Sequence, residues 1–188
     1  MNLKTYEYLF LYAINPKTNK IYFSVRASID YGLAGALIYE LIKEGIVVID
    51  ENKLEIKDSE IEDDTLQLTI AAIKKIDKKS VRKNTSGIAN KINKIRESII
   101  LSLVRKKILE LNEGQILGVF QNNTYIVKNE SLLSSHTQKL KSTFLNEINA
   151  TNNEVMLLNL IEACALTKKV FPDKQERKKF KNWLKSKN

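Results

Sequence analysis

Residues that cross-link or interrupt a chain are scarce in this sequence, which has 1 cysteine, 2 prolines and 6 glycines among 188 residues. One thiol cannot form an internal disulfide, and Cys164 lies in the apolar run 157–166, so we expect a buried, reduced cysteine and an intracellular location. Few glycines and prolines leave little material for tight turns. The sequence therefore predicts a mainly α protein, a single compact helical domain over 1–188 with one or two short β-hairpins and a basic tail from about 174 to 188.

Long apolar runs are absent as well. No stretch approaches the ~18 apolar residues that a bilayer span requires. The first residues have too short an apolar continuation for a signal peptide. We therefore expect any membrane contact to be peripheral.

The chain also lacks the motifs of common catalytic and cofactor sites. It contains no phosphate-binding loop, zinc-ligand set or dinucleotide fingerprint. His136, the only histidine, lies in a polar stretch typical of a surface loop, and Cys164 has no histidine near it in the sequence. These absences predict a protein that is not an enzyme and that binds no cofactor or metal.

Positive charge is present in excess, and it is concentrated. Residues 74–107 hold twelve basic and two acidic side chains, a local charge of +10 in a chain whose total is +9. Residues 40–64 hold ten acidic and three basic side chains. A cationic segment of this size attracts polyanions, and the two common kinds are nucleic acid and an anionic membrane surface.

Apolar periodicity and turn residues predict the order of the elements. Helices are expected at 3–14, 28–44, 66–76, 88–109, 131–148 and 154–170, the second with Ser28 or Asp30 as its N-cap and Gly45 at its end. A short strand is expected at 21–25, hairpins at 46–56 and at 115–127 with its turn at 121–123, and a polar basic connection at 78–87. Gly32 and Gly35 lie one turn apart, which predicts close packing of another segment. Twice a helix precedes a hairpin, as in winged-helix DNA-binding domains.

The predicted helix 88–109 separates its apolar and basic residues. At 100° per residue, five apolar positions fall within about 80° of one another: Ile88, Ile92, Ile95, Ile99 and Leu103. A second sector about 60° wide holds the basic face: Lys91, Lys94, Ser98 and Arg105. Arg96 lies on the apolar flank, where a guanidinium that is always charged needs a partner. Two partners fit, namely an acidic side chain from residues 30–64 or a ligand anion in a pocket.

The second predicted hairpin has few polar side chains. Its apolar residues are Ile116, Leu117, Val119, Phe120, Tyr125, Ile126 and Val127. A hairpin with one buried face should alternate apolar and polar positions, and this one alternates poorly. Either both of its faces are buried, or its tip meets a membrane or a partner.

Several segments together resemble the Golgi phosphoprotein 3 family. They are residues 8–11 with the Asn-Pro turn that follows, residues 31–41 closed by Gly45 and Ile46, residues 95–99 running into 103–109, and residues 158–171, which are similar to the family's late helix. The resemblance spans residues 3–171. It implies a single, mainly helical domain without enzyme activity. The short basic tail lacks the longer C-terminal region of the family's eukaryotic members, which favours a prokaryotic member.

The resemblance also implies a lipid site. The family's eukaryotic members hold phosphatidylinositol 4-phosphate in a pocket of one tryptophan and three arginines, beside an apolar hairpin that enters the bilayer. Arg96 matches one of these arginines, whereas Val25, Ala34 and Asn93 stand at the other three positions. The resemblance implies Arg96 and Asn93 at the headgroup or anion site, and the predicted site adds Lys94, Lys91 and Arg26 as sources of nearby charge. The implied membrane-inserting residues of the hairpin are Leu117, Val119, Phe120, Tyr125 and Ile126.

The predicted function is that of a non-enzymatic, peripheral membrane-binding or adaptor protein in the cytoplasm. Its expected partners are anionic membrane lipid and, as the resemblance implies, the cytoplasmic tails of membrane proteins. The alternative is a winged-helix-like nucleic-acid-binding protein. In that case the basic face of 88–109 would lie on an exposed recognition helix, and binding would fall steeply with salt.

Overall fold

Helices dominate the fold, as the sequence predicts. The computed structural model describes residues 3–57, 61–76, 80–116, 120–146 and 149–187, and the side chains of 115, 116, 120 and 121 lie outside this description. The helical elements are α1 (Thr5–Tyr12), the 3₁₀ turn η1 (Phe23–Val25), α2 (Arg26–Lys43), α3 (Asp64–Ile76), α4 (Val81–Ala89), α5 (Asn93–Arg105), α6 (Glu130–Leu145), α7 (Asn152–Ala163), α8 (Thr167–Val170) and α9 (Lys174–Lys187). The strands are β1 (Ile14–Asn15), β2 (Lys20–Ile21), β3 (Val47–Asp50), β4 (Lys53–Ile56), β5 (Leu109–Asn112), β6 (Gln115–Ile116), β7 (Phe120–Gln121) and β8 (Thr124–Val127).

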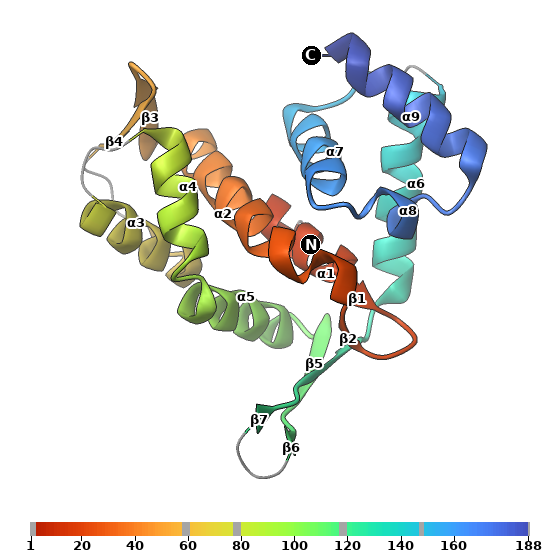
Figure 1. The fold of residues 1–188 in the computed structure, drawn as a ribbon, viewed down its shortest axis with the longest axis horizontal. Helices are drawn as coiled ribbons and strands as arrows, with labels where there is room; N and C mark the ends of the chain where they lie inside the picture. Colours follow the sequence, from red (N-terminus) through yellow and green to blue (C-terminus); the bar gives the residue numbers. More distant parts are fainter. Residues whose placement is uncertain (1–2, 58–60, 77–79, 117–119, 147–148, 188) are drawn as a thin grey trace.

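Helix α2 runs through the middle of the molecule (Figure 1). It packs against α3 and α4 on one side and against α1 and α7 on the other, while α5 packs on α3. Helices α6 and α9 pack together at the outer edge of the second side. The ribbon formed by β5 to β8 projects below the helices, and the β3–β4 hairpin stands at the opposite end (Figure 1). Among the described residues, no helix has the length and apolar content that crossing a membrane requires.

Helix α1 lies in the core because it is apolar on nearly every side. Tyr6, Leu9, Phe10 and Leu11 are each at most 1% exposed. Glu7 is buried among them, and its carboxylate accepts hydrogen bonds from Ser102 Oγ (2.9 Å) and Lys106 Nζ (2.6 Å). The predicted buried first helix is confirmed, and its one charged inward side chain is paired, as burial of a charge requires.

Helix α2 begins earlier than predicted and ends where predicted. Its first residue is Arg26, after the 3₁₀ turn η1, so Ser28 lies inside the helix, and its hydroxyl donates to the carbonyl oxygens of Val25 and Cys164. The predicted strand at 21–25 was therefore wrong beyond Ile21, since the chain turns into η1. Gly45 follows the helix with φ of 72°, the left-handed conformation that favours glycine at a helix end.

The long helix predicted at 88–109 is two helices, α4 and α5, and this prediction was wrong. The chain turns through residues 90–92, where the amides of Lys91 and Ile92 bond to carbonyls three residues back. Such 3₁₀-type bonds keep the apolar residues near a helical spacing, so periodicity alone does not reveal the break. The predicted core stripe from Ile88 to Leu103 is buried throughout.

The predicted basic connection at 78–87 was also wrong for the described residues from 80 onward, because they begin α4. Ser80 caps this helix by accepting a hydrogen bond from the amide of Lys83. Its apolar face is short, with Ile88 and Ala89 buried beside the polar Asn84. A single helix of nine residues with so few apolar positions has too little periodicity to be recognised from sequence.

The first predicted hairpin is confirmed as β3 paired with β4. The second one has a different pairing from the one predicted, because β8 pairs with β5 rather than with the segment that starts at 115. The strands β6 and β7 pair with each other and extend the ribbon outward. The predicted turn at 121–123 is therefore part of the ribbon, where the amide of Asn122 donates to the carbonyl of Gly114.

The C-terminal part is more structured than a basic tail. The predicted helix 154–170 is interrupted after α7, where Ala165 adopts a positive φ of 57°, and α8 follows. Residues 174–187 form α9, whose Phe180 and Leu184 are buried. Phe180 meets Phe144 and Phe171 with ring centroids 5.3 and 5.2 Å apart. The lysines of this segment therefore lie on the exposed part of a helix that Phe180 and Leu184 anchor to the core.

Candidate anion-binding cleft

A cleft of about 350 Å³ opens where the β-ribbon leaves the helices. Segments far apart in the sequence meet here: β2, the first turns of α2, α5 and β8. Its polar lining consists of Lys20, Arg26, Asp30, Arg96, Asn122 and Asn123, and its apolar lining includes Phe10, Ile29 and Tyr125. Three cations therefore face one carboxylate, and the cleft has an excess of positive charge.

Arg96 reaches the cleft from α5 and is half-buried. Its guanidinium donates a hydrogen bond to the carboxylate of Asp30, on the first turns of α2. Of the two partners predicted from the sequence, the acidic side chain from residues 30–64 is present as Asp30. The ligand anion stays a prediction, and Arg96 lines a cleft in which it would bind. An arginine has five N–H donors, so one bond to Asp30 leaves donors for a second acceptor.

Lys20 and Arg26 come from the segment that leads into α2. Lys20 Nζ donates to Oδ1 of Asn122, on the ribbon. The Arg26 guanidinium lies over the ring of Phe23, 5.5 Å from its centroid. Lys20 was not among the predicted site residues, and no local pattern marks it. It reaches the cleft because the turn before β2 bonds to β8, where the amide of Tyr125 donates to the carbonyl of Asn19 (2.6 Å).

Tyr125 provides a neutral hydroxyl at the cleft. Its ring packs edge-on against Phe10 with centroids 5.6 Å apart. Burial raises the pKa of the Tyr125 hydroxyl and outweighs the opposing effects of Arg96 and Asn123. The hydroxyl therefore stays protonated at neutral pH and can donate a hydrogen bond to an anion.

The remaining predicted headgroup residues lie apart from this cleft. Lys91 is exposed in the turn before α5, and Asn93 and Lys94 are exposed in its first turn. None of the three lines the cleft. Val25 and Ala34 are completely buried. The structure thus brings together Arg96 and Arg26 from the predicted set and adds Lys20.

The predicted basic face of helix 88–109 is not one surface. Lys91 lies in the turn before α5 rather than on the helix. Ser98 is buried and shares a hydrogen bond with Thr65, and Arg105 pairs with Asp64 at 3.2 Å. The face was derived from a continuous helix, and the turn at 90–92 changes the direction in which its first members point.

The predicted hairpin residues divide between the base of the ribbon and its outer part. Tyr125 and Ile126 are half-buried at the base, where Tyr125 lines the cleft and Ile126 lines a separate groove beside Tyr12 and Tyr22. Leu117 and Val119 lie outside the described residues, as does the side chain of Phe120. Insertion of the outer part into a membrane stays a prediction.

His136 lies in α6 rather than in a surface loop, so that expectation was wrong. Its ring stacks on Tyr8 with centroids 3.6 Å apart, and Nδ1 is 3.0 Å from the Tyr12 hydroxyl. Burial lowers its pKa to about 4, so the imidazole is neutral at pH 7. Cys164 is buried as predicted, and burial raises the pKa of its thiol to about 11. Both side chains act in packing here.

The sequence of the chain matches the model of a known protein family. Residues 6–187 match Golgi phosphoprotein 3 (GPP34), the family that the sequence motifs resemble. No curated protein matches the chain. Because the family match covers nearly all of the 188 residues, the chain belongs to the Golgi phosphoprotein 3 family.

Proposed function

We propose that this protein is a non-enzymatic, peripheral membrane-binding protein of the adaptor type, and that its cleft takes the phosphate groups of an anionic lipid headgroup such as phosphatidylinositol 4-phosphate. The observation that carries the proposal is the convergence of Lys20, Arg26 and Arg96 in one cleft at the base of the β-ribbon. Membership of the Golgi phosphoprotein 3 family supports it.

The cleft suits a phosphate in charge and in donors. Three cations against Asp30 leave a net charge of +2 among the groups that line it. Neutral hydrogen-bond donors also line the cleft, namely the side-chain amides of Asn122 and Asn123 and the hydroxyl of Tyr125. Its volume of about 350 Å³ lies within the range of small-ligand sites, roughly 300–1,000 Å³.

The position of the cleft suits a membrane-embedded ligand. A headgroup held among Lys20, Arg26 and Arg96 lies beside Asn122, Asn123 and Tyr125 of the ribbon. The ribbon of β5 to β8 projects from the body of the molecule (Figure 1). The acyl chains of the lipid would then extend on the side to which the ribbon projects. The apolar sequence of that ribbon is consistent with contact with a bilayer.

The test is co-sedimentation with three kinds of phosphatidylcholine vesicle. The first contains no anionic lipid, the second contains phosphatidylserine, and the third contains phosphatidylinositol 4-phosphate at the same total charge as the second. We expect binding only to the anionic vesicles. The double variant Lys20→Gln/Arg26→Gln should bind about tenfold more weakly or worse, because each cation near an anionic surface contributes ~1 kcal/mol. Lys53→Gln, which removes one exposed charge from β4 at the opposite end of the molecule, is the control for position and should bind like wild type.

Two results would contradict the proposal. One is equal binding, or equal absence of binding, with neutral and anionic vesicles. The other is a double variant that binds anionic vesicles as tightly as the Lys53→Gln control does. The combined substitution Leu117→Asp/Phe120→Asp is a further arm, and it should weaken vesicle binding if the outer part of the ribbon enters the membrane.

Asp30→Asn should strengthen binding to anionic vesicles about fivefold. This change raises the net charge of the cleft from +2 to +3 and releases Arg96 from its carboxylate partner. Because the amide oxygen of asparagine still accepts a hydrogen bond from Arg96, the substitution should change stability by about 1 kcal/mol. Weaker binding than wild type would mean that Asp30 is needed to hold Arg96 in place. Asp50→Asn, on β3, is the control for charge alone.

A further inference from the structure

A second cationic surface lies on α8 and α9. In the depression that these helices line, the acidic Glu162 accepts a hydrogen bond from the hydroxyl of Thr167. Residues 167–187 contain nine basic and two acidic side chains. Six of the eight exposed lysines in this segment line one depression and form what we call the lysine face: Lys168, Lys169, Lys174, Lys178, Lys179 and Lys181. In the described part of the chain, no ion pair involves any of them.

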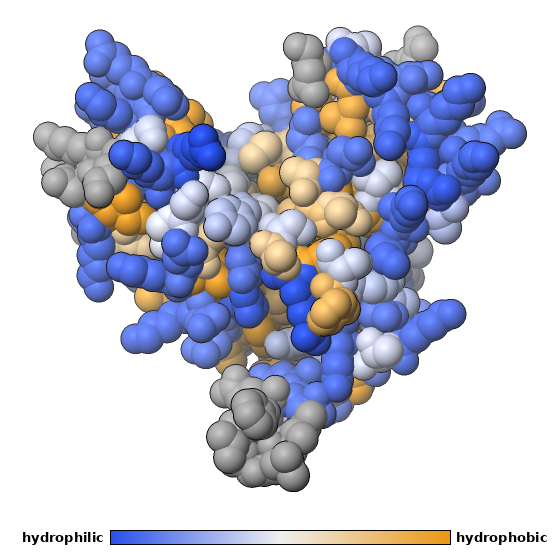
Figure 2. All heavy atoms as spheres, in the orientation of Figure 1, coloured by the Kyte–Doolittle hydropathy of each residue, from blue (hydrophilic) through white to orange (hydrophobic). Residues whose placement is uncertain are grey.

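The two acidic residues of this segment point elsewhere. Asp173 accepts hydrogen bonds from the amides of Gln175 and Glu176, both 2.8 Å long, and so caps the start of α9. Glu176 pairs with Lys141 on α6 at 2.9 Å. The apolar face of α9 is packed into the core, so the lysine face is held outward. Figure 2 shows hydrophilic side chains covering α9 on this side of the molecule.

An exposed aromatic ring stands between the lysine face and the cleft. Phe23 is 84% exposed, whereas the next most exposed large apolar side chain in the described part, Leu101, is 55% exposed. Its turn, η1, is fixed, because Val25 is completely buried and the amide of Tyr22 donates to the carbonyl of Ala13 (2.9 Å). Phe23 is therefore presented from a rigid position.

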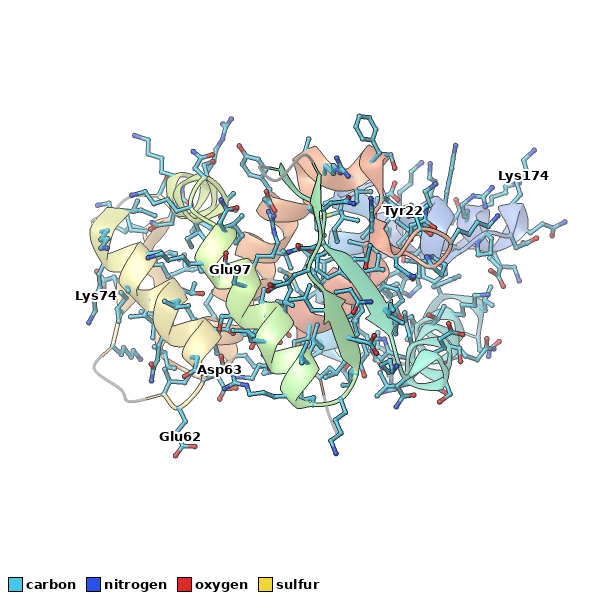
Figure 3. The ribbon with its side chains drawn as sticks, turned by 90° about the horizontal axis from the view of Figure 1, so that it is seen from below. Tyr22, Glu62, Asp63, Lys74, Glu97 and Lys174 are labelled. Atoms are coloured by element: carbon cyan, nitrogen blue, oxygen red, sulfur yellow. The ribbon has the colours of Figure 1, made fainter. Side chains whose placement is uncertain are left out.

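Cations flank this turn on both sides. Toward the cleft, Arg26 lies over the ring of Phe23. Toward α8, Lys169 Nζ lies 4.8 Å from the centroid of the Tyr22 ring, and Ser24 lines the same depression as Lys168. The cleft, Phe23 and the lysine face are thus neighbours along one stretch of surface. Tyr22 and Lys174, both labelled in Figure 3, lie in the same half of that view.

We infer that Phe23 and the lysine face form the surface that lies against an anionic bilayer, with the ring of Phe23 inserted at the interface and the lysines among the lipid phosphates. The inference rests on the proposed function and adds to it the orientation of the protein on the membrane. A row of flexible lysines suits a diffuse anionic plane. An exposed apolar ring among cations gains from entering the bilayer interface. Binding to single-stranded nucleic acid commonly uses several stacking aromatic rings along a groove, and the described part of this surface presents Phe23 alone as a highly exposed one.

The first experiment measures binding to vesicles of phosphatidylcholine with phosphatidylserine. Phe23→Ser should reduce binding about tenfold without changing the thermal unfolding midpoint, because its side chain is exposed. The quadruple variant Lys168→Gln/Lys169→Gln/Lys174→Gln/Lys178→Gln should reduce it at least tenfold. Its control removes the same charge from the other end of the molecule, where Lys74 is labelled in Figure 3: Lys74→Gln/Lys75→Gln/Arg82→Gln/Lys83→Gln. This control should bind within about twofold of wild type.

The second experiment reports insertion directly. The Phe23→Trp variant should show a blue-shifted emission and quenching by lipids brominated in the acyl chains, measured against Trp183, the tryptophan that the wild type already contains. Ile49→Trp, an equally apolar exposed site on β3 at the far end of the molecule, should show neither effect.

The outcomes separate this inference from the proposed function. Vesicle binding that needs Lys20 and Arg26 but is unchanged in Phe23→Ser and in the quadruple α8–α9 variant would overturn the inference and leave the headgroup site standing. Binding that needs Phe23 and the lysine face but not Lys20 and Arg26 would support the inference and remove the headgroup site. No vesicle binding by wild type, or retention of a random DNA duplex in place of vesicles, would overturn both.

Discussion

Replacing Glu40 by alanine is expected to lower the free energy of unfolding by about 3 kcal/mol. Glu40 is completely buried, and its Oε1 accepts hydrogen bonds from the backbone amide (2.8 Å) and the hydroxyl (2.6 Å) of Thr5. Thr5 is the first residue of α1, where unsatisfied amides attract negative charge. Lys43 Nζ lies 2.6 Å from the other oxygen. The alanine variant would leave two donors of Thr5 without an acceptor in the core.

Urea unfolding at pH 7 measures this effect, and two further variants show its origin. Glu40→Gln keeps an oxygen for Thr5 and loses the ion pair with Lys43, so its effect should fall between those of wild type and alanine. Glu44→Ala, at the exposed residue that follows the last residue of α2, loses only a pair with Lys4 at 3.8 Å and should change stability by less than about 0.5 kcal/mol. Equal effects of the Glu40 and Glu44 alanine variants would show that Glu40 does not hold α1.

The contribution of Glu40 should disappear in acid. Burial raises the pKa of this carboxyl, but hydrogen bonds from Lys43 and Thr5 and the charge of Lys43 lower it by more, so its pKa in the folded protein lies below the ordinary value of 4.5. A lowered folded-state pKa gives stability that is present above 4.5 and is lost as the pH falls through the folded value. The difference between wild type and Glu40→Ala should therefore shrink on going from pH 7 to below pH 4.

The second large effect is expected at Gly32, where alanine should lower the free energy of unfolding by about 2 kcal/mol. A Cβ at this position would lie 2.2 Å from Cys164 Sγ and 3.2 Å from Leu9 Cδ2. The sulfur cannot swing away cheaply, because Cys164 is 1% exposed and its side chain is short. This clash should exceed the gain of ~1 kcal/mol that alanine brings to a helix interior over glycine.

Gly35 is the matched control, because it lies one turn further along the same helix. There a Cβ would meet Leu160 Cδ2 at 3.6 Å, an ordinary contact, so Gly35→Ala should stabilise the protein by about 0.5 kcal/mol. Removing the sulfur as well, in Gly32→Ala/Cys164→Ala, should recover at least about 1 kcal/mol beyond the sum of the two single effects. A double variant whose loss equals that sum would exclude Cys164 as the cause.

Several cations of the segment 74–107 are paired with acidic side chains in the structure, so fewer of them are free to bind a polyanion than the sequence indicates. Arg96 and Arg105 are paired with Asp30 and Asp64, and Lys106 is paired with the buried Glu7. The lysine face carries fewer cations in all, but none of its six is in an ion pair within the described residues. A count of charges along the chain does not distinguish paired from free cations, because most of these acidic partners come from other helices.

Much of the secondary structure was predictable because it depends on neighbours in the sequence. The continuously apolar α1, the stripe from Ile88 to Leu103 and the hairpin of β3 and β4 each show their spacing or turn residues directly. The break between α4 and α5 was not predictable on this basis, since a short 3₁₀ turn preserves the spacing of the isoleucines. The helix α9 was missed because only its buried Phe180 and Leu184, with the half-buried Trp183, interrupt a lysine-rich stretch.

The sequence by itself determined the helical class, the buried stripe, the excess of positive charge and the family. Only the tertiary structure decided which cations share a site. Arg96 could be assigned a partner of opposite charge from its place on an apolar flank, but not Asp30 in particular. Lys20 joined the cleft through the bonds of its turn to β8, and Phe23 became the exposed ring of a fixed turn through the burial of Val25. Periodicity is a local property, whereas a binding surface is formed by segments that meet only after the helices pack.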